Sequence, residues 1–395
     1  MKNLGRVSLG VFAILWLTGC GSGSPTFSML PSGDTFKQSD AVFNNQLDIL
    51  WVVDNSGSMQ PLQTNMVTNF NSFISNFQTK GYDFRMAVTA TDAYKANTQF
   101  VQYNSGNAGL SLFQDGAANG DPSGVFVIIP STPNLDNVFV ANATTGINGS
   151  GDERAFSSMA TAMANTNNPA FLRSNSFFAI IILSDEDDFS NYSRTEGSWG
   201  SNDALDHCYV NSAMDQIATT AYSGPNHVSA CASQTPPDSV QSYVNYFDSM
   251  TQSTGTTRRW NVSAITVLDS ACQASHMGTN PSGASWVTVE GQRYVQLSQA
   301  TNGIQGSICD ASYANSLSAI AAQITTLSTQ FFLNQVPQVS TIVVTVNGVI
   351  IPDNATNGWQ YSSSNNSIQF FGTAVPPQGA TISVNFVPAS VQNNG

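Results

Sequence analysis

The sequence is poor in charged residues. Only 9% of its 395 residues are Asp, Glu, Lys or Arg, and 12 basic residues stand against 25 acidic ones, which gives a net charge of −13. A chain with so little positive charge has no electrostatic means of attracting nucleic acid or an anionic membrane surface. We therefore predict no nucleic-acid partner and expect the acidic residues to serve solubility and cation binding.

The motifs of common catalytic and nucleotide-binding sites are also absent. The sequence contains no GxSxG, P-loop, GxGxxG or HExxH pattern. Residues 54–57 (DNSG) faintly resemble the nucleophile loop of a serine protease, but the three histidines lie in polar stretches where nothing marks a base and its orienting partner. We predict that the protein is not an enzyme.

Long apolar runs are absent after the first twenty residues. Residues 1–19 combine the positive charges of Lys2 and Arg6 with an apolar core, Val7–Leu17, that is too short to span a membrane permanently. This pattern is typical of a targeting segment, which we exclude from the fold.

The end of that segment, residues 17–20 (LTGC), resembles a bacterial lipobox. This resemblance implies cleavage before Cys20, lipidation of its thiol with acyl chains such as palmitate, and attachment to the cell envelope. Because Gly21 follows the cysteine, it further implies the outer membrane. The alternative is an ordinary signal peptide with an incidental cysteine.

Cysteine is scarce and shows no CxxC spacing. Four cysteines remain beyond Cys20: Cys208, Cys231, Cys272 and Cys309. In an oxidising compartment they predict two disulfides, of which three pairings exist. We favour the sequential pairing, Cys208–Cys231 and Cys272–Cys309, each worth about 3–4 kcal/mol in the chain-entropy model. A zinc site that joins His207 and His227 to the first two cysteines is the alternative.

Among the features that are present, residues 47–59 (LDILWVVDNSGSM) organise the chain. The apolar run Ile49–Val53 predicts a strand buried on both faces, as in a parallel sheet covered by helices. Asp54, Ser56 and Ser58 follow at its carboxyl end, where ligands gather in open α/β sheets. One carboxylate and two hydroxyls suit Mg²⁺ or Mn²⁺ better than zinc or copper.

Acidic residues follow two further predicted strands. Asp92 follows Tyr82–Thr91, and four consecutive acids, residues 185–188, follow Phe177–Leu183 and Ser184. Four unpaired carboxylates cannot all be buried, so either an ion lies nearby or the segment is a solvated acidic turn. Further polar residues are expected in support or at the rim of the site: Asn55, Asp92, Asp152, Glu186 and Asp187.

The D-x-S-x-S spacing of residues 54–58 after an apolar strand resembles the von Willebrand factor type A (vWA) family. The resemblance implies a three-layer, doubly wound (Rossmann-like) α/β domain with a mostly parallel central sheet and a metal-ion-dependent adhesion site (MIDAS). It further implies that Ser56 and Ser58 coordinate a divalent cation, Mg²⁺ or else Mn²⁺ or Ca²⁺, directly. Asp54 and Asp185 would hold the ion directly or through hydroxyls and waters.

The sequence departs from that family pattern in the segment Asn148–Phe156. A threonine expected before the next helix is missing, and Glu153 stands at or beside its position, as in a subset of exported bacterial vWA lipoproteins. We therefore include Glu153 among the metal ligands, where its charge would weaken capture of an acidic ligand or make the metal mainly structural. The alternative is that Asp152 and Glu153 merely favour the amino end of the helix.

The domain organisation follows from changes in pattern along the chain. We expect a signal peptide, a flexible tether, a vWA domain with insertions near residues 93–125 and 189–238, and a small all-β domain, over residues 1–19, 20–45, 46–330 and 336–390 respectively. Finer expectations are one helix over Gln60–Lys80 and an edge strand over Val125–Pro130.

Together these features predict a membrane-anchored lipoprotein that binds an unidentified protein, or another acidic ligand, through the cation. The partner is expected to offer a carboxylate to an open coordination position. The alternative is a metal-independent envelope scaffold, or a non-catalytic subunit of a surface complex, in which the small β domain forms the interface.

Overall fold

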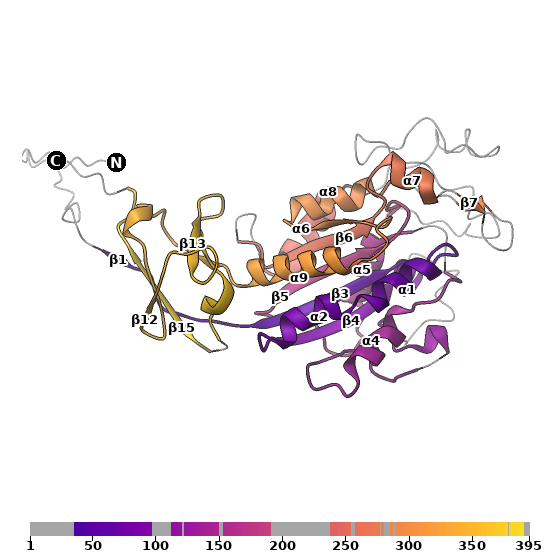
Figure 1. The fold of residues 1–395 in the computed structure, drawn as a ribbon, viewed down its shortest axis with the longest axis horizontal. Helices are drawn as coiled ribbons and strands as arrows, with labels where there is room; N and C mark the ends of the chain where they lie inside the picture. Colours follow the sequence, from indigo (N-terminus) through magenta and orange to yellow (C-terminus); the bar gives the residue numbers. More distant parts are fainter. Residues whose placement is uncertain are drawn as a thin grey trace, which may run out of the picture.

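The computed structural model describes residues 35–96 and 112–390, with gaps at 121, 150–152, 191–237, 254–256, 277, 280–284, 287–289 and 378. Within these residues the chain forms two units that lie side by side (Figure 1). One is a parallel sheet covered by helices, and the other is an antiparallel β unit. None of the described helices is both long and apolar enough to cross a membrane.

The larger unit is built on a five-stranded sheet in which every strand is parallel to its neighbours. Its order is β4-β3-β5-β6-β9. The bounds of these strands, in chain order, are Gln46–Val53 (β3), Asp83–Ala90 (β4), Phe177–Leu183 (β5), Trp260–Thr266 (β6) and Gln305–Ser307 (β9). Every residue of β5 and β6 is buried, as expected where helices cover both faces of a parallel sheet.

Alternate residues of β3 point into two separate cores. Trp51 packs in the first core with Phe73 and Phe139. Leu50 and Val52, on either side of Trp51 in the sequence, belong to the second core. The helices of the first core are α1 (Gln60–Thr68), α2 (Asn71–Gln78), α4 (Leu135–Ala143) and α9 (Ala314–Ser328). Those of the second core are α5 (Ala155–Ala164), α6 (Val240–Met250) and α8 (Gln292–Ala300).

Short elements complete this unit. They are the helix α7 (Ser270–His276), the paired strands β7 (Gly278–Thr279) and β8 (Ser285–Trp286), and the 3₁₀ helices η1 (Ala93–Ala96) and η2 (Ala117–Asn119).

The smaller unit consists of two antiparallel sheets around a core of its own. One sheet has the order β1-β15-β11-β12, with β2 also paired to β15, and the other has the order β10-β14-β13. The strands of the first are β1 (Phe36–Lys37), β2 (Ala41–Val42), β11 (Val343–Val346), β12 (Val349–Ile351) and β15 (Thr381–Phe386). The second contains β10 (Phe331–Phe332), β13 (Trp359–Ser362) and β14 (Ser367–Phe370), and the 3₁₀ helices are η5 (Val339–Thr341) and η6 (Gly372–Ala374).

The predicted fold class, a vWA domain followed by a small C-terminal all-β domain, is wrong in this form. The structure combines one parallel sheet with antiparallel sheets, and the antiparallel part is not C-terminal alone. Phe36 pairs with Phe386 and Ala41 pairs with Ile382, so residues expected in the flexible tether lie in strands. Pairing across some 340 residues leaves no local trace in the sequence.

Two finer expectations are also wrong. The helix expected over Gln60–Lys80 is interrupted between α1 and α2, where the Asn69 side chain donates to the backbone oxygen of Asn65 at 2.8 Å and so competes with helical hydrogen bonding. The edge strand expected over Val125–Pro130 is reduced to one antiparallel bridge between Met86 and Ile128.

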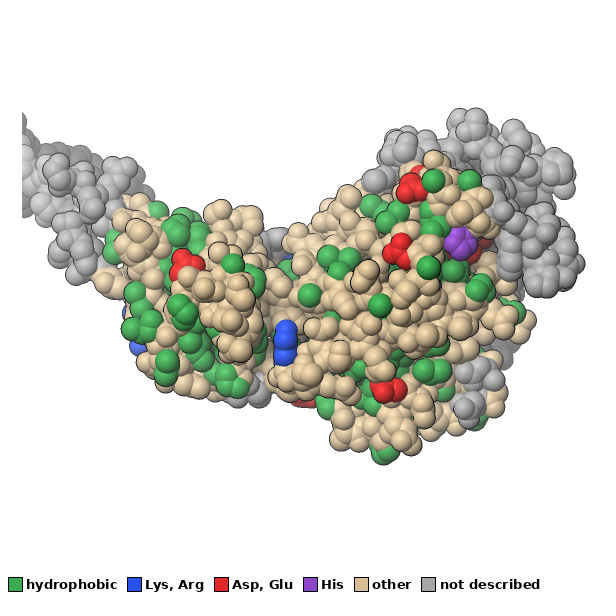
Figure 2. Space-filling model, viewed as in Figure 1, with side chains coloured by type: hydrophobic (Ala, Val, Ile, Leu, Met, Phe, Trp, Pro, Cys, Tyr) green, Lys and Arg blue, Asp and Glu red, His purple; other side chains and the backbone are tan. Residues whose placement is uncertain are grey.

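The parallel strands run away from the antiparallel unit. Strand β3 begins at Gln46, four residues after the end of β2, and runs from there away from the antiparallel unit (Figure 1). The carboxyl edge of the sheet is therefore the end of the molecule opposite the antiparallel unit. Charged side chains are sparse on the face that Figure 2 shows.

Candidate metal centre

The carboxyl edge gathers the residues that follow the parallel strands. Backbone hydrogen bonds continue one step beyond the strands, from Asp54 N to Leu183 O at 2.9 Å and from Ser184 N to Ile265 O at 3.2 Å. The sheet register thus sets Asp54 beside the segment that carries Asp185. Two acidic residues 131 positions apart in the sequence meet because their strands are adjacent.

The turn after β3 is held by its own acid and hydroxyls. One oxygen of Asp54 accepts from the backbone N–H of Ser56 at 2.8 Å, and the other accepts from the Ser184 hydroxyl at 2.7 Å. The Ser56 and Ser58 hydroxyls lie 3.2 Å apart, and Ser58 donates to Asp185 at 3.1 Å. The structure therefore brings four of the predicted ligands into one continuous chain of contacts.

Glu153 is the least satisfied group at this edge. Its side chain is 0% exposed, and among the described residues no N–H or hydroxyl donates to either carboxylate oxygen; its polar neighbour is the carboxyl group of Glu186. Burial, followed by the charges of Glu186, Asp54 and Asp185, raises the pKa of Glu153 well above its ordinary value. All three of these neighbouring charges are acidic, so ionised Glu153 is unfavourable here unless a positive charge joins it.

Asp54 and Asp185, which follow strands β3 and β5, are also unfavourable to ionise. Burial raises the pKa of Asp54 to about 6, against the hydrogen bonds from Ser184 and Ser56 that lower it. Burial and the charge of Asp54 raise the pKa of Asp185 to about 8, and the Ser58 hydroxyl opposes this rise. In the absence of a cation, ionising the whole group near neutral pH is therefore costly.

The donor set fits a hard divalent cation. Carboxylates and hydroxyls offer only oxygen, which Mg²⁺, Mn²⁺ and Ca²⁺ prefer, and the buried oxygens of Glu153 have an unmet need for positive charge. Within the described residues these carboxylates do not form a set of three with ligand atoms inside 4.8 Å of one another. A cation at this edge would accordingly depend on the hydroxyls of Ser56 and Ser58 as well.

Two neighbouring contacts position the turn. Gln63, 2% exposed in α1, donates from its amide to the backbone oxygens of Asp54 at 2.7 Å and Gly146 at 2.9 Å. Asn55 donates to Asp92 at 3.1 Å, and its backbone oxygen accepts from Gly149 N at 2.7 Å. Sequence reasoning missed Gln63, because a glutamine in an amphipathic helix carries no signal that its amide will face a strand end.

Asp187 and Asp188 both interact with Arg293. Asp188 does not lie in a solvated turn, which was one of the two alternatives for this segment. It is wholly buried, where it pairs with Arg293 at 3.2 Å and accepts from the first-turn N–H of Phe156 at 2.9 Å. Asp187 accepts from the backbone N–H of Arg293 at 2.9 Å, and burial raises its pKa to about 7 against the charge of that arginine. The acids after β5 therefore divide into two sets, and Arg293 was not recognisable from the sequence.

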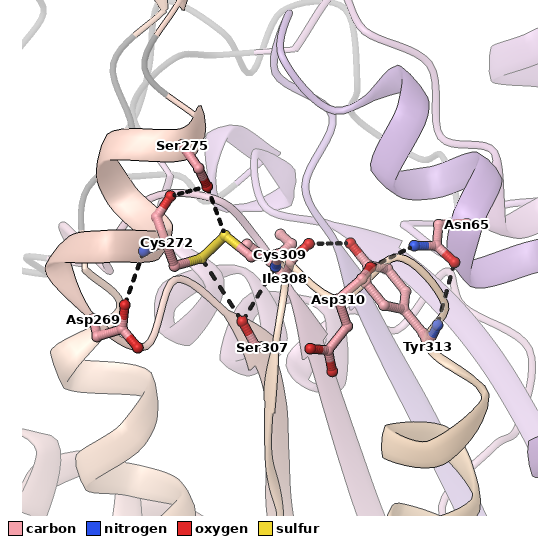
Figure 3. The surroundings of a disulfide bond; sticks show 9 residues. All are labelled: Asn65, Asp269, Cys272, Ser275, Ser307, Ile308, Cys309, Asp310 and Tyr313. Atoms are coloured by element: carbon pink, nitrogen blue, oxygen red, sulfur yellow. Dashed lines mark hydrogen bonds between the residues drawn. A yellow bond between two sulfur atoms is a disulfide. The ribbon is translucent and has the colours of Figure 1, made fainter.

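The remaining predicted residues are placed as follows. Asp92 and Glu186 are half-buried at the rim, while Asp152, Cys208, Cys231 and the lipidation residue Cys20 lie outside the described residues. The predicted disulfide Cys272–Cys309 is present and joins the start of α7 to the segment after β9 (Figure 3).

No protein-family model matches the sequence, and no curated protein matches it. The structure is similar to the pilus adhesin SpaC from Lactobacillus rhamnosus GG in its open conformation, with 13% identity over 89% of this chain and 39% of that chain and a TM-score of 0.35. The adhesive tip pilin GBS104 from Group B Streptococcus agalactiae gives 10% identity over 91% and 83% of the two chains and a TM-score of 0.29. Proximal thread matrix protein 1 from the mussel byssus gives 10% identity, 76% and 52% coverage, and a TM-score of 0.32.

The chain thus spans about two fifths of the length of the SpaC chains that it matches. With TM-scores under 0.5, these likenesses carry no argument about its role. The predicted membership of the vWA family is wrong: no family model matches, and the similar solved structures are described as pilus adhesins, a tip pilin and a thread matrix protein. The D-x-S-x-S spacing is short enough to arise in any polar turn after a buried strand, so it located a sheet edge without identifying a family.

Proposed function

We propose that this chain is a surface adhesion protein that binds a divalent cation at the carboxyl edge of its parallel sheet. The cation is Mg²⁺, or Mn²⁺ or Ca²⁺ in its place, and its ligands are Asp54, Ser56, Ser58, Glu153 and Asp185. The observation that carries the proposal is the buried Glu153 carboxylate, which receives no N–H or hydroxyl donor from the described residues and lies among other acids. A divalent cation is the simplest group that would stabilise these charges together.

The proposed partner is a protein that offers a carboxylate. When bound, the cation supplies an electrophilic centre with coordination positions beyond those filled by the chain. Access to it is supported by the exposure of Gly57 and the partial exposure of Ser58, which place the turn after β3 at the surface. The neutral hydroxyls of Ser56 and Ser58 add ligands without adding negative charge, which leaves room for an acid from outside.

The cell envelope is the proposed location, with attachment through acyl chains on Cys20. This part rests on the targeting pattern of residues 1–20 and on the arrangement of the two units. The first described strand, β1, belongs to the antiparallel unit, and the carboxyl edge lies at the other end of the molecule (Figure 1). An anchor that precedes β1 would leave the cation site facing away from the membrane.

The proposal is tested by calorimetric titration of purified protein with Mg²⁺, Mn²⁺ and Ca²⁺. We expect saturable binding that Asp54→Asn abolishes without unfolding the chain, because asparagine keeps an oxygen acceptor for the N–H of Ser56. Asp353→Asn, which removes an exposed acid in the antiparallel unit, is the matched control and should bind as the parent does. Parent protein that binds none of the three ions, or equal binding by both variants, would refute the site.

A metal-independent scaffold is the second candidate. It is favoured by strand β12 at the edge of its sheet, where Val349 is 65% exposed and Ile350 is 70% exposed. Exposed apolar side chains on an unpaired edge are suited to protein contact. Attachment of the protein to its target that persists with a chelator present, and in Asp54→Asn, would favour this scaffold over cation-dependent adhesion.

A further inference from the structure

A second group of potential metal ligands lies around the disulfide. Cys272 and His276 are one helical turn apart on α7, so their side chains lie on the same face of that helix. Cys309 faces them from the segment after β9. The two sulfur atoms and one ring nitrogen of His276 all lie within 4.8 Å of one another.

The backbone around these side chains is held by bonds that do not use the disulfide. The N–H of Cys272 donates to Asp269 at 2.8 Å, and the N–H of Cys309 donates to the Ser307 hydroxyl at 3.2 Å (Figure 3). The Tyr313 hydroxyl donates to the backbone oxygen of Ile308 at 2.9 Å. Opening the sulfur–sulfur bond would therefore leave both cysteines in place on the same two segments.

The local surroundings also suit the thiolate form. The Ser307 hydroxyl donates toward the sulfur of Cys272 at 3.7 Å. The Ser275 hydroxyl lies 3.4 Å from the sulfur of Cys309 and donates to the backbone oxygen of Cys272 at 2.8 Å. Hydroxyls that donate to ligating sulfurs are the kind of support on which metal sites depend. His276 and Cys309 are half-buried, so a metal ion has a path to them. No group in the described part of the chain is hydrogen-bonded to the His276 ring, which leaves it available as a ligand.

We propose that the reduced protein binds Zn²⁺, or a similar thiophilic cation, through Cys272, His276 and Cys309. An external dithiol would break the disulfide, taking up the oxidation as its own disulfide and leaving two protein thiols. Zinc binding then releases two protons as both thiols become thiolates, and the neutral imidazole supplies the third ligand. The fourth position is left to water or a ligand from outside.

This site is independent of the proposed function at the neighbouring strand ends, because its donors are sulfur and nitrogen. Zinc would join α7 to the segment after β9, the same two segments that the disulfide joins in the oxidised chain. The inference is therefore that this connection exists in two interchangeable chemical forms, one for oxidising conditions and one for reducing conditions that contain zinc.

Cobalt(II) is the probe for the test, because thiolate ligation gives it an intense sulfur-to-metal charge-transfer band. The experiment uses the full chain with Cys208→Ser and Cys231→Ser, which removes the other thiols expected beyond Cys20, together with Cys20→Ser. After reduction with a phosphine, we expect one equivalent of Co²⁺ to bind with this band and one equivalent of Zn²⁺ to displace it. The oxidised protein should show no band.

Two variants in that background assign the ligands. Cys309→Ser should abolish the charge-transfer band, and His276→Ala should weaken Co²⁺ binding by about ten-fold or more, since it removes one of three protein ligands. Asp54→Asn should leave the band unchanged, which separates this site from the oxygen site. The inference is overturned if the reduced parent shows no band, if it loses its fold with zinc present, or if His276→Ala binds as tightly as the parent.

Discussion

Replacing Asp185 by asparagine should stabilise the cation-free protein at alkaline pH. Asp185 is 1% exposed and contacts Ser58, whose hydroxyl can donate equally well to the oxygen of an asparagine. The substitution therefore keeps the hydrogen bond and the volume of the side chain while it removes the charge. What changes is the cost of ionising this buried side chain beside Asp54.

The magnitude follows from the pKa of Asp185, which burial and the charge of Asp54 raise from 3.8 to about 8. The unfolded chain gives up this proton near pH 3.8, whereas the folded chain keeps it until about pH 8. The stability due to this group is thus fully present below pH 3.8 and is lost as the pH rises to about 8. Each pH unit between these values lowers the free energy of unfolding by about 1.4 kcal/mol, or about 4 kcal/mol from pH 5 to pH 8.

The assay is urea unfolding at pH 5, 6.5 and 8 in the presence of a chelator. The parent should lose about 4 kcal/mol more than Asp185→Asn over this range. A saturating divalent cation should reverse the effect, because a ligand at 1,000 times its dissociation constant stabilises the native state by about 4 kcal/mol. That gain should appear in the parent and be absent from the variant.

Asp48→Asn is the control for this experiment. Asp48 is equally buried, but it pairs with Arg173 at 2.7 Å at the other end of the sheet. Its substitution should cost about 1–3 kcal/mol, since Arg173 keeps its ion pair with Asp83 at 2.7 Å, and the parent's response to cations should remain. If the parent and Asp185→Asn respond to pH in the same way, the reasoning about this edge is refuted.

Two further substitutions test the surroundings of the site. Gly149→Ala should weaken cation binding and lower stability by about 1–3 kcal/mol, because the added methyl group would overlap the side chain of Asn55 in the turn after β3. Calorimetry measures the cation affinity and urea unfolding measures the stability. An unchanged cation affinity would contradict the positioning role of this contact. Arg293→Met should cost about 3–5 kcal/mol in urea unfolding by leaving Asp188 buried and unpaired, and a loss below about 1 kcal/mol would show that Asp188 has another source of compensation.

The parallel sheet was largely predictable because its strands are buried on both faces. The run Phe177–Leu183 is apolar throughout, and the observed β5 has the predicted bounds. The strand that precedes Asp54 likewise ends where the apolar run ends. Once several such strands are parallel, their following residues must meet at one edge, so the approach of Asp54 and Asp185 needed no knowledge of the detailed packing.

The antiparallel unit and the partners of the acids were not predictable in this way. Strands β1 and β2 have two residues each, and their partner β15 lies at the other end of the chain. The pairing of Asp188 with Arg293 spans 105 residues and is decided by how α8 packs, not by local pattern. A short motif therefore located the candidate site, but it did not predict the family, the domain boundaries or the contacts of each acidic residue.

The two ends of β3 differ in whether the chain supplies a positive charge to a buried aspartate. Asp48 lies near the start of β3 and Asp54 directly follows its last residue, and both are fully buried. Asp48 accepts from the Arg173 guanidinium at 2.7 Å and from its backbone N–H at 2.7 Å, so a positive charge is supplied by the chain itself. Asp54 receives hydroxyl and N–H donors, and its charge adds to those of Glu153 and Asp185. An aspartate at the same depth is therefore paired with an arginine at one end of β3, and at the other end with no arginine or lysine among the described residues. Titration with and without a divalent cation decides whether a bound cation or protonation compensates the acids of the carboxyl edge.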